Sequence, residues 1–357
     1  MRLHSARALR ALVLLSSVLG LLSSVGRADL VWSKDGGWRV EGGALSGLTG
    51  TEGRNALDQM NRARNSEEAG STRSAYKAYE SVGKKYPNSI YAPEALYRAA
   101  KIHLVRKEYT KAFDDFQQVL GRYPNTKRFN EIVGEQYRIA SAMLDGARSR
   151  ILWGMLPGFT QKEKALEYFE TILANAPYSD YAPLSLMNIA RGHQRLNQTE
   201  DAIDALDRMI NNYPQSLLAP DAYLKLGQTH ATLVEGPYYD QASTKEAITY
   251  YTDFMLLFPG DAGVAAAEKG LDGMKNMLAE SKMKIGDFYF YKRNNFTAAR
   301  VFYNEAITSY PESAIANRAK LRLADVEAKA AGKKIAPEGK APGDAAPKAK
   351  KKFLGIF

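Results

Sequence analysis

The sequence predicts an all-α fold, a solenoid of five to six helical hairpins. The prediction rests on a phrase with two prolines six residues apart that recurs along the chain. It rests also on a pattern of alanine, a large residue, an apolar residue and proline that occurs six times. Two of the intervals between the pattern prolines are 37 residues long. A period of about 30 to 50 residues built from helix pairs is typical of a solenoid.

The proline phrase predicts a corner between two helices. Its first proline ends a helix, because proline lacks the amide hydrogen that a helix interior needs and disfavours the α conformation of the residue before it. Its second proline opens the next helix, where that amide would have no partner in any case. The pairs are Pro87 and Pro93, Pro177 and Pro183, and Pro214 and Pro220.

The six-fold pattern predicts the packing face of the helix before each corner. Alanine is followed after four residues by a ring or leucine, after three more by an apolar residue, and after five more by proline. These spacings place the side chains on one helix face, where the small alanine allows a partner helix to approach and the large residue fills the space beside it. The sets are Ala75, Tyr79, Val82 and Pro87; Ala112, Phe116, Val119 and Pro124; Ala165, Phe169, Ile172 and Pro177; Ala202, Leu206, Met209 and Pro214; Ala247, Tyr251, Phe254 and Pro259; and Ala299, Tyr303, Ala306 and Pro311.

The composition allows a folded body and does not indicate a nucleic-acid partner. The chain has 357 residues, 45% of them hydrophobic, which is enough for a sizeable core. Its formal charge of +10 comes from four basic residues within 1–28 and a surplus of six within 329–357, so residues 29–328 are neutral. A phosphate-binding surface is therefore not expected.

Residues 1–28 have the features of a secretory signal peptide. A basic start precedes the apolar stretch 11–25, and a small-x-small cleavage site ends at Ala28. The alternative, a membrane anchor, is disfavoured because the stretch is shorter than the roughly 20 residues that a spanning helix needs. We therefore expect export to the periplasm. The chain has no cysteine, which excludes disulfides, thiol chemistry and a lipid anchor on a cysteine.

The sequence contains no motif for catalysis, a cofactor or a metal. It lacks a phosphate-binding loop, a G-x-S-x-G motif and an H-E-x-x-H motif, and the glycine-rich stretch from Gly42 lacks the lysine and spacing of a nucleotide loop. His103, His193 and His230 each lie 16 residues after a corner proline. They therefore occupy equivalent repeat positions, too far apart to bind one ion. We expect them to pack, and we expect neither a cofactor nor enzymatic activity.

The segment ILWGMLPGF forms the centre of an insertion at residues 149–160. Its glycines and proline exclude a regular helix, yet it is rich in large apolar side chains. One interpretation is a loop folded back onto its own repeat. The other is an exposed apolar patch that binds a partner or a lipid surface. The residues assigned to this partner-binding loop are Trp153, Met155, Leu156 and Phe159.

The chain resembles the tetratricopeptide-repeat family, whose second helix carries the same alanine, aromatic and proline spacing. Towards the C-terminus the resemblance narrows. Residues 262–292 lack a helix-ending proline and lead into KIGDFYFYKRNNFTAARVFYNEAITSYPES. This arrangement is similar to the last repeats of the BamD family, periplasmic subunits of the outer-membrane β-barrel assembly machine, and the similarity covers roughly residues 55–328. The long segment predicts a helix of about 45 Å that braces the last hairpin.

The resemblance implies a non-enzymatic scaffold at the inner face of the outer membrane. It would bind the barrel-forming subunit and unfolded outer-membrane proteins, without nucleic acid and without a transmembrane span, though peripheral membrane association is compatible with it. BamD-type proteins are typically acylated on a cysteine, so this chain resembles a member tethered by protein contacts. A periplasmic adaptor that coordinates cell-wall synthesis or division is the alternative.

Residues 29–53 are expected to form a leader with a small hairpin around Asp35-Gly36-Gly37, followed by the repeats at 54–328. Tetratricopeptide grooves are lined by first-helix positions two, five, nine and twelve. In this chain those positions are apolar with scattered cations, which suits extended, partly apolar segments such as unfolded barrel strands, although the same residues would also suit plain surface. The groove assignments are Tyr97, Lys101, Arg138, Arg191 and Gln194.

Residues 329–357 are expected to form a disordered basic tail. Alanine, proline, glycine and lysine dominate it and cannot form a core. Its final KAKKKFLGIF is either an untidy terminus or a short motif that enters a partner's groove while the lysines attract an acidic or anionic surface. The motif residues are Phe353, Leu354, Ile356 and Phe357.

Overall fold

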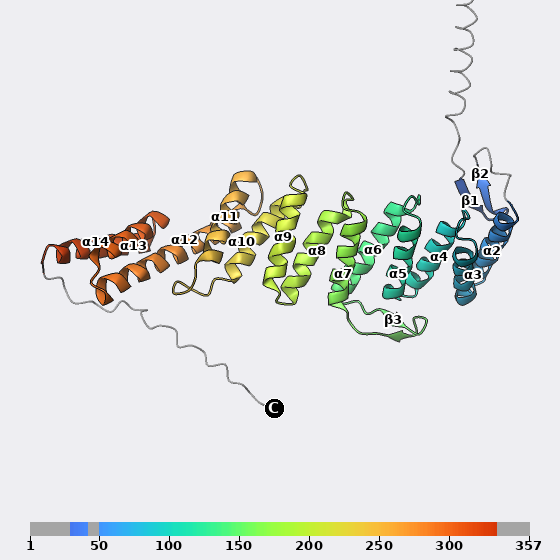
Figure 1. Ribbon diagram of the computed structural model, residues 1–357, viewed down its shortest axis with the longest axis horizontal. Helices are drawn as coiled ribbons and strands as arrows, with labels where there is room; N and C mark the ends of the chain where they lie inside the picture. The colour runs from blue at the N-terminus through green and yellow to red at the C-terminus, as the bar shows by residue number, and fades with distance from the viewer. Residues whose placement is uncertain (1–28, 42–49, 334–357) are drawn as a thin grey trace, which may run out of the picture. The chain divides into compact units, whose positions relative to one another are not determined.

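The computed structural model of the chain describes residues 29–41 and 50–333. The predicted signal peptide at 1–28 and the tail motif from Phe353 to Phe357 lie outside the described residues. The described part of the chain holds thirteen α-helices, one five-residue π-helix and two small two-stranded sheets (Figure 1). The predicted all-α fold of helical hairpins is confirmed.

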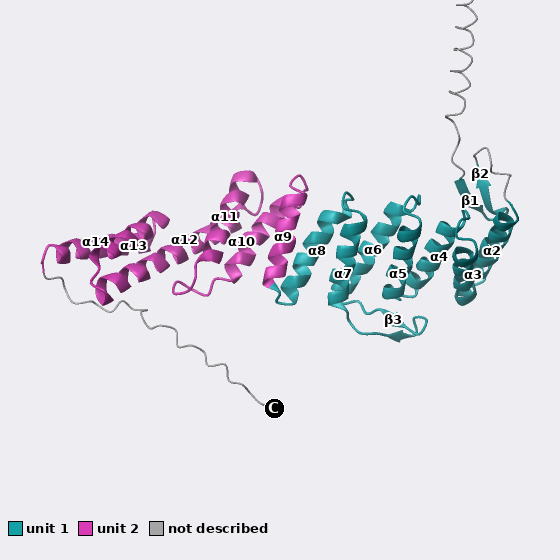
Figure 2. Cartoon of the chain, in the orientation of Figure 1, with its two compact units in different colours: residues 1–198 teal, residues 199–357 magenta. Residues whose placement is uncertain are grey.

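The chain divides into two compact units, residues 1–198 and 199–357 (Figure 2). Unit 1 contains β1 (Asp29–Ser33), β2 (Gly37–Glu41), α2 (Thr51–Glu68), α3 (Thr72–Lys85), α4 (Ala92–Val105), α5 (Tyr109–Arg122), α6 (Phe129–Leu144), β3 (Arg150–Ile151), β4 (Leu156–Pro157), α7 (Lys162–Asn175) and α8 (Tyr181–Arg195). Unit 2 contains α9 (Thr199–Asn212), α10 (Ala219–Thr232), α11 (Ala242–Leu257), α12 (Val264–Asp287), the π-helix η1 (Phe288–Lys292), α13 (Phe296–Ser309) and α14 (Ala314–Ala330). In chain order the helices form six pairs followed by α14.

The corner prolines bound the helices as predicted. The second helix of every pair, from α3 to α13, ends two residues before its pattern proline. At the first corner the amide of Tyr86 still donates to the carbonyl of Val82 at 2.9 Å, and Pro87 follows immediately after this last bond. Pro93 and Pro220 are the second residues of α4 and α10. The missing amide hydrogen therefore costs no intrahelical bond at these positions.

The six-fold pattern forms the core of the helix pairs. All eighteen apolar and aromatic members of the sets are buried, with at most 4% of any of these residues exposed. Neighbouring helices approach closely around them. A Cβ added at Gly227 or Gly270 would lie 2.7 or 2.4 Å from the ring of Tyr251. Large rings of one helix thus pack against small residues of its neighbour.

The β1–β2 hairpin covers the first helix pair. Its strands pair antiparallel with Trp32 opposite Trp38. Trp38 is 4% exposed within the core of α2 and α3, and its amide donates to Oδ1 of Asn61 at 2.9 Å. The guanidinium of Arg98 lies 4.6 Å from the centre of the Trp38 ring. The hairpin therefore shields an apolar face that a terminal repeat would otherwise leave without a neighbour.

The predicted long C-terminal helix is present as α12 followed without a break by η1. α12 has 24 residues, about 36 Å at 1.5 Å per residue. Its end packs with α13 and α14 around Phe290 and Tyr303, both fully buried, and the Tyr303 hydroxyl donates to Oδ1 of Asp287 at 2.7 Å. In the described part of the chain no helix combines the length and apolarity that a membrane crossing requires.

The core role of the pattern predicts a large difference between two phenylalanines of unit 1. Phe116→Ala should lower the free energy of unfolding by about 3 to 5 kcal/mol, because it opens a cavity at a fully buried ring. The matched control Phe159→Ala, at a side chain 89% exposed, should change it by less than about 0.5 kcal/mol. Urea titration followed by helical circular dichroism measures both. Equal midpoints for the two variants would contradict the packing role.

Candidate functional site

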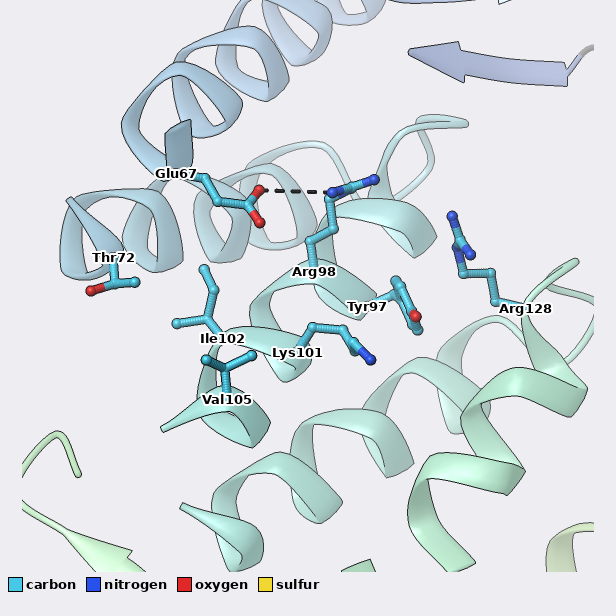
Figure 3. Close-up of a pocket in the computed structure, with 8 residues that line it drawn as sticks. All are labelled: Glu67, Thr72, Tyr97, Arg98, Lys101, Ile102, Val105 and Arg128. Atoms are coloured by element: carbon cyan, nitrogen blue, oxygen red, sulfur yellow. Dashed lines mark ion pairs between the residues drawn. The ribbon is translucent and has the colours of Figure 1, made fainter. Parts of the chain in front are cut away.

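A cleft of about 350 Å³ opens on unit 1 along α4 (Figure 3). Side chains from the end of α2 and the start of α3 form one wall, and Arg128, just before α6, forms the other (Figure 3). Two of the five predicted groove residues, Tyr97 and Lys101, lie in it. The lining residues are Glu67, Thr72, Tyr97, Arg98, Lys101, Ile102, Val105 and Arg128.

Three side-chain contacts join α4 to the α6 region at a constant sequence separation of 34. Nε of Arg128 donates to Oε2 of Glu94 at 2.5 Å. The Tyr97 hydroxyl donates to the carboxylate of Glu131.

The third contact joins Nζ of Lys101 to Oε1 of Glu135 at 2.7 Å. The separation of 34 is three residues shorter than the interval of 37 between Pro87 and Pro124, so each contact joins a residue of α4 to one that lies nearly one helical turn before its equivalent in the α6 region. We call these three contacts the polar ladder.

The polar ladder leaves the cleft with paired charges. Arg98 lies 2.8 Å from Glu94 and 3.7 Å from Glu67, the ion pair drawn in Figure 3. Burial raises the pKa of Glu131, but hydrogen bonds from Tyr97 and Arg128 outweigh this and hold the pKa below its ordinary value. Burial and the bond to Glu131 raise the pKa of Tyr97, so its hydroxyl stays neutral.

At the far end of α4 the lining is apolar. Val105 is 77% exposed there, next to the buried Ile102. A bound segment would therefore meet hydrogen-bonding groups at one end of the cleft and apolar surface at the other. An arrangement of this kind suits an extended peptide.

The other three predicted groove residues lie elsewhere on unit 1. The side chain of Arg138 is 71% exposed and sits 3.1 Å from Glu135. Arg191 lies 3.2 Å from Asp145, between α8 and the end of α6. Gln194 is exposed near the end of α8. The structure does not bring these residues into the cleft, so their role in a groove stays a prediction.

The β3–β4 hairpin separates the four residues assigned to the partner-binding loop. Trp153 is half-buried rather than exposed, because its ring stacks on His103 at a centroid distance of 5.6 Å and meets Tyr76 edge-on at the same distance. The guanidinium groups of Arg73 and Arg106 each lie 5.2 Å from it. Trp153 thus fits the interpretation of a loop folded back onto its own repeat.

The remaining three residues of that assignment point into solvent. Met155 is 72%, Leu156 49% and Phe159 89% exposed. These side chains fit the interpretation of an exposed apolar patch. Each of the two interpretations of the insertion therefore describes a different part of one hairpin.

The histidines make contacts within their own repeats. Nδ1 of His103 lies 2.9 Å from Oε2 of the fully buried Glu108, and Nδ1 of His193 lies 2.9 Å from Oε1 of Gln198, at the same spacing of five residues. His230 stacks on Tyr250. These contacts agree with the packing role expected for the three positions.

A partly buried carboxylate, that of Asp115, accompanies His103. Oδ2 of Asp115 lies 3.7 Å from Nε2 of His103 and makes no hydrogen bond within the described residues. Burial, with the nearby charges of Glu80 and Asp114, raises the pKa of Asp115 to about 7. Burial also lowers the pKa of His103 against the opposing effect of its hydrogen bond to the Glu108 carboxylate. The two groups therefore favour their neutral forms.

Sequence reasoning did not single out Arg98, Arg128 or Glu67 as cleft residues. The signal that locates the polar ladder is the recurrence of complementary side chains 34 residues apart, as in Glu94 and Arg128. Glu67 enters from the end of α2.

Comparison with known protein families shows which families the chain is similar to. A family model described as "Outer membrane lipoprotein" (YfiO) matches residues 160–335, and a model of the tetratricopeptide repeat matches residues 59–89 and 94–126.

Curated relatives point the same way. The chain is 27% identical over 138 residues to the outer membrane protein assembly factor BamD of Caulobacter vibrioides, covering 39% of this chain and 45% of that protein. It is 27% identical over 148 residues to BamD of Rickettsia prowazekii (42% and 59%), and 22% identical over 156 residues to BamD of Xylella fastidiosa (41% and 53%).

The chain is BamD-like. Each match spans about half the length of the BamD relative concerned. Among solved structures, a tetratricopeptide repeat protein from Parabacteroides merdae is 12% identical and covers 77% of this BamD-like chain and all of its own, with a TM-score of 0.31. That score is too low to support an inference about function.

The raised pKa of Asp115 predicts a pH-dependent effect of its replacement. The folded state holds a proton up to about pH 7, whereas the unfolded state releases it near its ordinary pKa of 3.8. Stability contributed by the neutral form is therefore present at low pH and lost as the pH rises through this window.

Asp115→Asn should accordingly raise the free energy of unfolding at pH 8, on the order of 1 to 3 kcal/mol, and by much less at pH 4. Denaturant titrations at both pH values measure the difference. The matched control Asp58→Asn, at an exposed position of α2, should show no such pH dependence. An Asp115→Asn effect that is constant between pH 4 and pH 8 would contradict the protonated folded state.

Proposed function

We propose that this BamD-like chain is a non-enzymatic periplasmic scaffold in the assembly of outer-membrane β-barrel proteins. The observation that carries the proposal is the family match over residues 160–335, joined by relatives named as outer membrane protein assembly factors. The scaffold would bind the barrel-forming subunit and unfolded substrates while peripheral at the inner face of the outer membrane. The signal features of residues 1–28 support export.

We assign the unfolded substrate to the cleft of unit 1. Its charges are already paired, so a ligand need not supply a compensating charge. Its apolar end at Ile102 and Val105 suits the alternating apolar side chains of an unfolded barrel strand. The Tyr97 and Lys101 side chains at its centre offer polar contacts to the backbone of such a strand.

We assign the barrel-forming subunit to unit 2. All helices of this unit lie inside the matched residues 160–335. Its π-helix begins at Phe288, which is 45% exposed with the guanidinium of Arg293 5.3 Å away. Tyr238, 54% exposed, lies 5.5 Å from Nζ of Lys284. Aromatic side chains and arginine are the groups most enriched at protein interfaces, and π-helices often mark functional positions.

Site-specific photo-crosslinking in cells tests both assignments. A photoreactive residue at Val105 should capture unfolded outer-membrane proteins, and one at Phe288 should capture the barrel-forming subunit. The matched control is Leu217, a corner residue 97% exposed, which should capture neither. Because all three side chains are exposed, the substitutions should leave the fold unchanged.

Capture of cell-wall synthases or division proteins alone, from Val105 or Phe288, would overturn the assembly role and support an adaptor of the cell wall. Capture of the barrel-forming subunit at Val105 and of substrates at Phe288 would reverse the assignment of the two surfaces. Turnover of a substrate lost on changing one polar residue of the intact fold would contradict a non-enzymatic scaffold.

A further inference from the structure

We propose that the β3–β4 hairpin, residues 148–159, is a lipid-binding element that lies on the surface of an anionic phospholipid bilayer. The proposal rests on the proposed function only in placing the chain beside a membrane. It assigns a contact by which a chain without cysteine can touch that membrane directly. Figure 1 shows the hairpin leaving the helical layer of unit 1 beside the ends of α4 and α5.

The hairpin presents an unusual density of exposed apolar side chains. Five of them are about half or more exposed: Ile151 50%, Leu152 58%, Met155 72%, Leu156 49% and Phe159 89%. Monomeric proteins rarely expose contiguous apolar groups of this kind unless they face a partner or a membrane. Most of the hairpin's apolar surface is therefore left uncovered by unit 1.

The backbone holds these side chains outwards. The amide of Arg150 donates to the carbonyl of Lys107 at 2.8 Å, and that of Gly158 donates to the carbonyl of Ser149 at 3.0 Å. Oγ of Ser149 accepts from the amide of Thr110 at 3.2 Å. The hairpin is thus fixed to the turn between α4 and α5.

The tip of the hairpin adopts a costly conformation. Leu152 and Trp153 have φ angles of 51° and 58°, in the left-handed region that costs roughly 1 to 2 kcal/mol per residue for side chains of this kind. The ring contacts of Trp153 with His103 and Tyr76 offset this conformational cost. One ring is buried as an anchor, and the strained turn directs the remaining apolar side chains away from the helices.

The charged residues within the hairpin stretch are of one sign. No carboxylate lies between Asp145 and Glu163, whereas this stretch carries Arg148, Arg150 and Lys162. Arg148, Arg150 and Lys107 are exposed, and none makes an ion pair with a residue in the described ranges. Every cation of the cleft, by contrast, is paired with a carboxylate.

Unpaired cations around an apolar tip match an anionic lipid surface. The apolar groups enter the headgroup boundary while arginine and lysine contact the phosphates. Phe159, Met155 and the two arginines would also suit a protein surface, but a stretch without any carboxylate from residue 146 to 162 favours a surface that is negatively charged throughout. The only tryptophan of the hairpin is turned inwards.

Fluorescence at the hairpin tests the proposal directly, since a chain without cysteine can be labelled at one introduced thiol. Full-length Phe159→Cys labelled with a nitrobenzoxadiazole dye should shift to shorter wavelength and brighten on vesicles that contain phosphatidylglycerol, but not on phosphatidylcholine alone. The same dye on Leu217→Cys, in unit 2, should not respond. Reading the label at residue 159 separates the hairpin from any binding by the basic tail.

Variants then separate charge from apolar contact. Arg148→Gln with Arg150→Gln should weaken the vesicle response by roughly 25-fold, at about fivefold per cation. The matched pair Arg122→Gln with Lys320→Gln, at exposed positions on α5 and α14, should not. Met155→Ser, which removes no charge and no backbone contact, should weaken the response several-fold. Unchanged helical circular dichroism shows that each variant is folded.

An absent dye response at residue 159, in a chain that still sediments with anionic vesicles, would overturn the proposal, because binding would then come from elsewhere. A response to purified soluble domains of the barrel-forming subunit, without one to vesicles, would also overturn it and identify a protein as the occupant. Neither result affects the crosslinks from Val105 and Phe288. The hairpin and the scaffold role can therefore fail separately.

Discussion

The repeated packing of a ring against alanines is the interaction on which the structure depends. In each pair the second helix buries an alanine, a large side chain and a further apolar residue, and none of these eighteen residues is more than 4% exposed. A single pair cannot cover this face, so the energy of the fold resides in contacts between neighbours. The terminal pair of unit 1 accordingly carries the β1–β2 hairpin, whose Trp38 enters the same core.

The same packing frees the other faces of the helices for binding. Since the apolar pattern fixes the spacing of successive repeats, side chains of α4 meet those of the α6 region at a constant separation of 34 residues and form the polar ladder. The cleft is a consequence of this regularity rather than of a dedicated loop. The β3–β4 hairpin has the opposite origin, because it interrupts the repeat and carries side chains that the repeat does not need.

The helices could be predicted from the sequence because their signals are local. Proline limits the helix that it belongs to, and spacings of four and three residues define one face of a single helix. The burial of Tyr79 and Phe169 could therefore be predicted from their own helices alone. The cleft was found only in part, because Glu67 and Arg128 reach it from different helices. In the hairpin, composition indicated apolar residues, but only the position of Tyr76 and His103 decides that Trp153 turns inwards while Phe159 does not.

The polar ladder holds the cleft wall together by ionic contacts and hydrogen bonds, whereas apolar packing holds the core of unit 1. Of its three glutamates, Glu131 is 43% exposed, whereas Glu94 at 11% and Glu135 at 5% are largely buried. Electrostatic attraction at the exposed groups weakens as dissolved ions accumulate. The alanine and ring contacts behind them do not depend on ions. High salt would therefore weaken the exposed ionic contacts of the cleft wall, while the apolar contacts behind them keep their geometry. The rigidity of the cleft thus depends on ionic strength as well as on its residues.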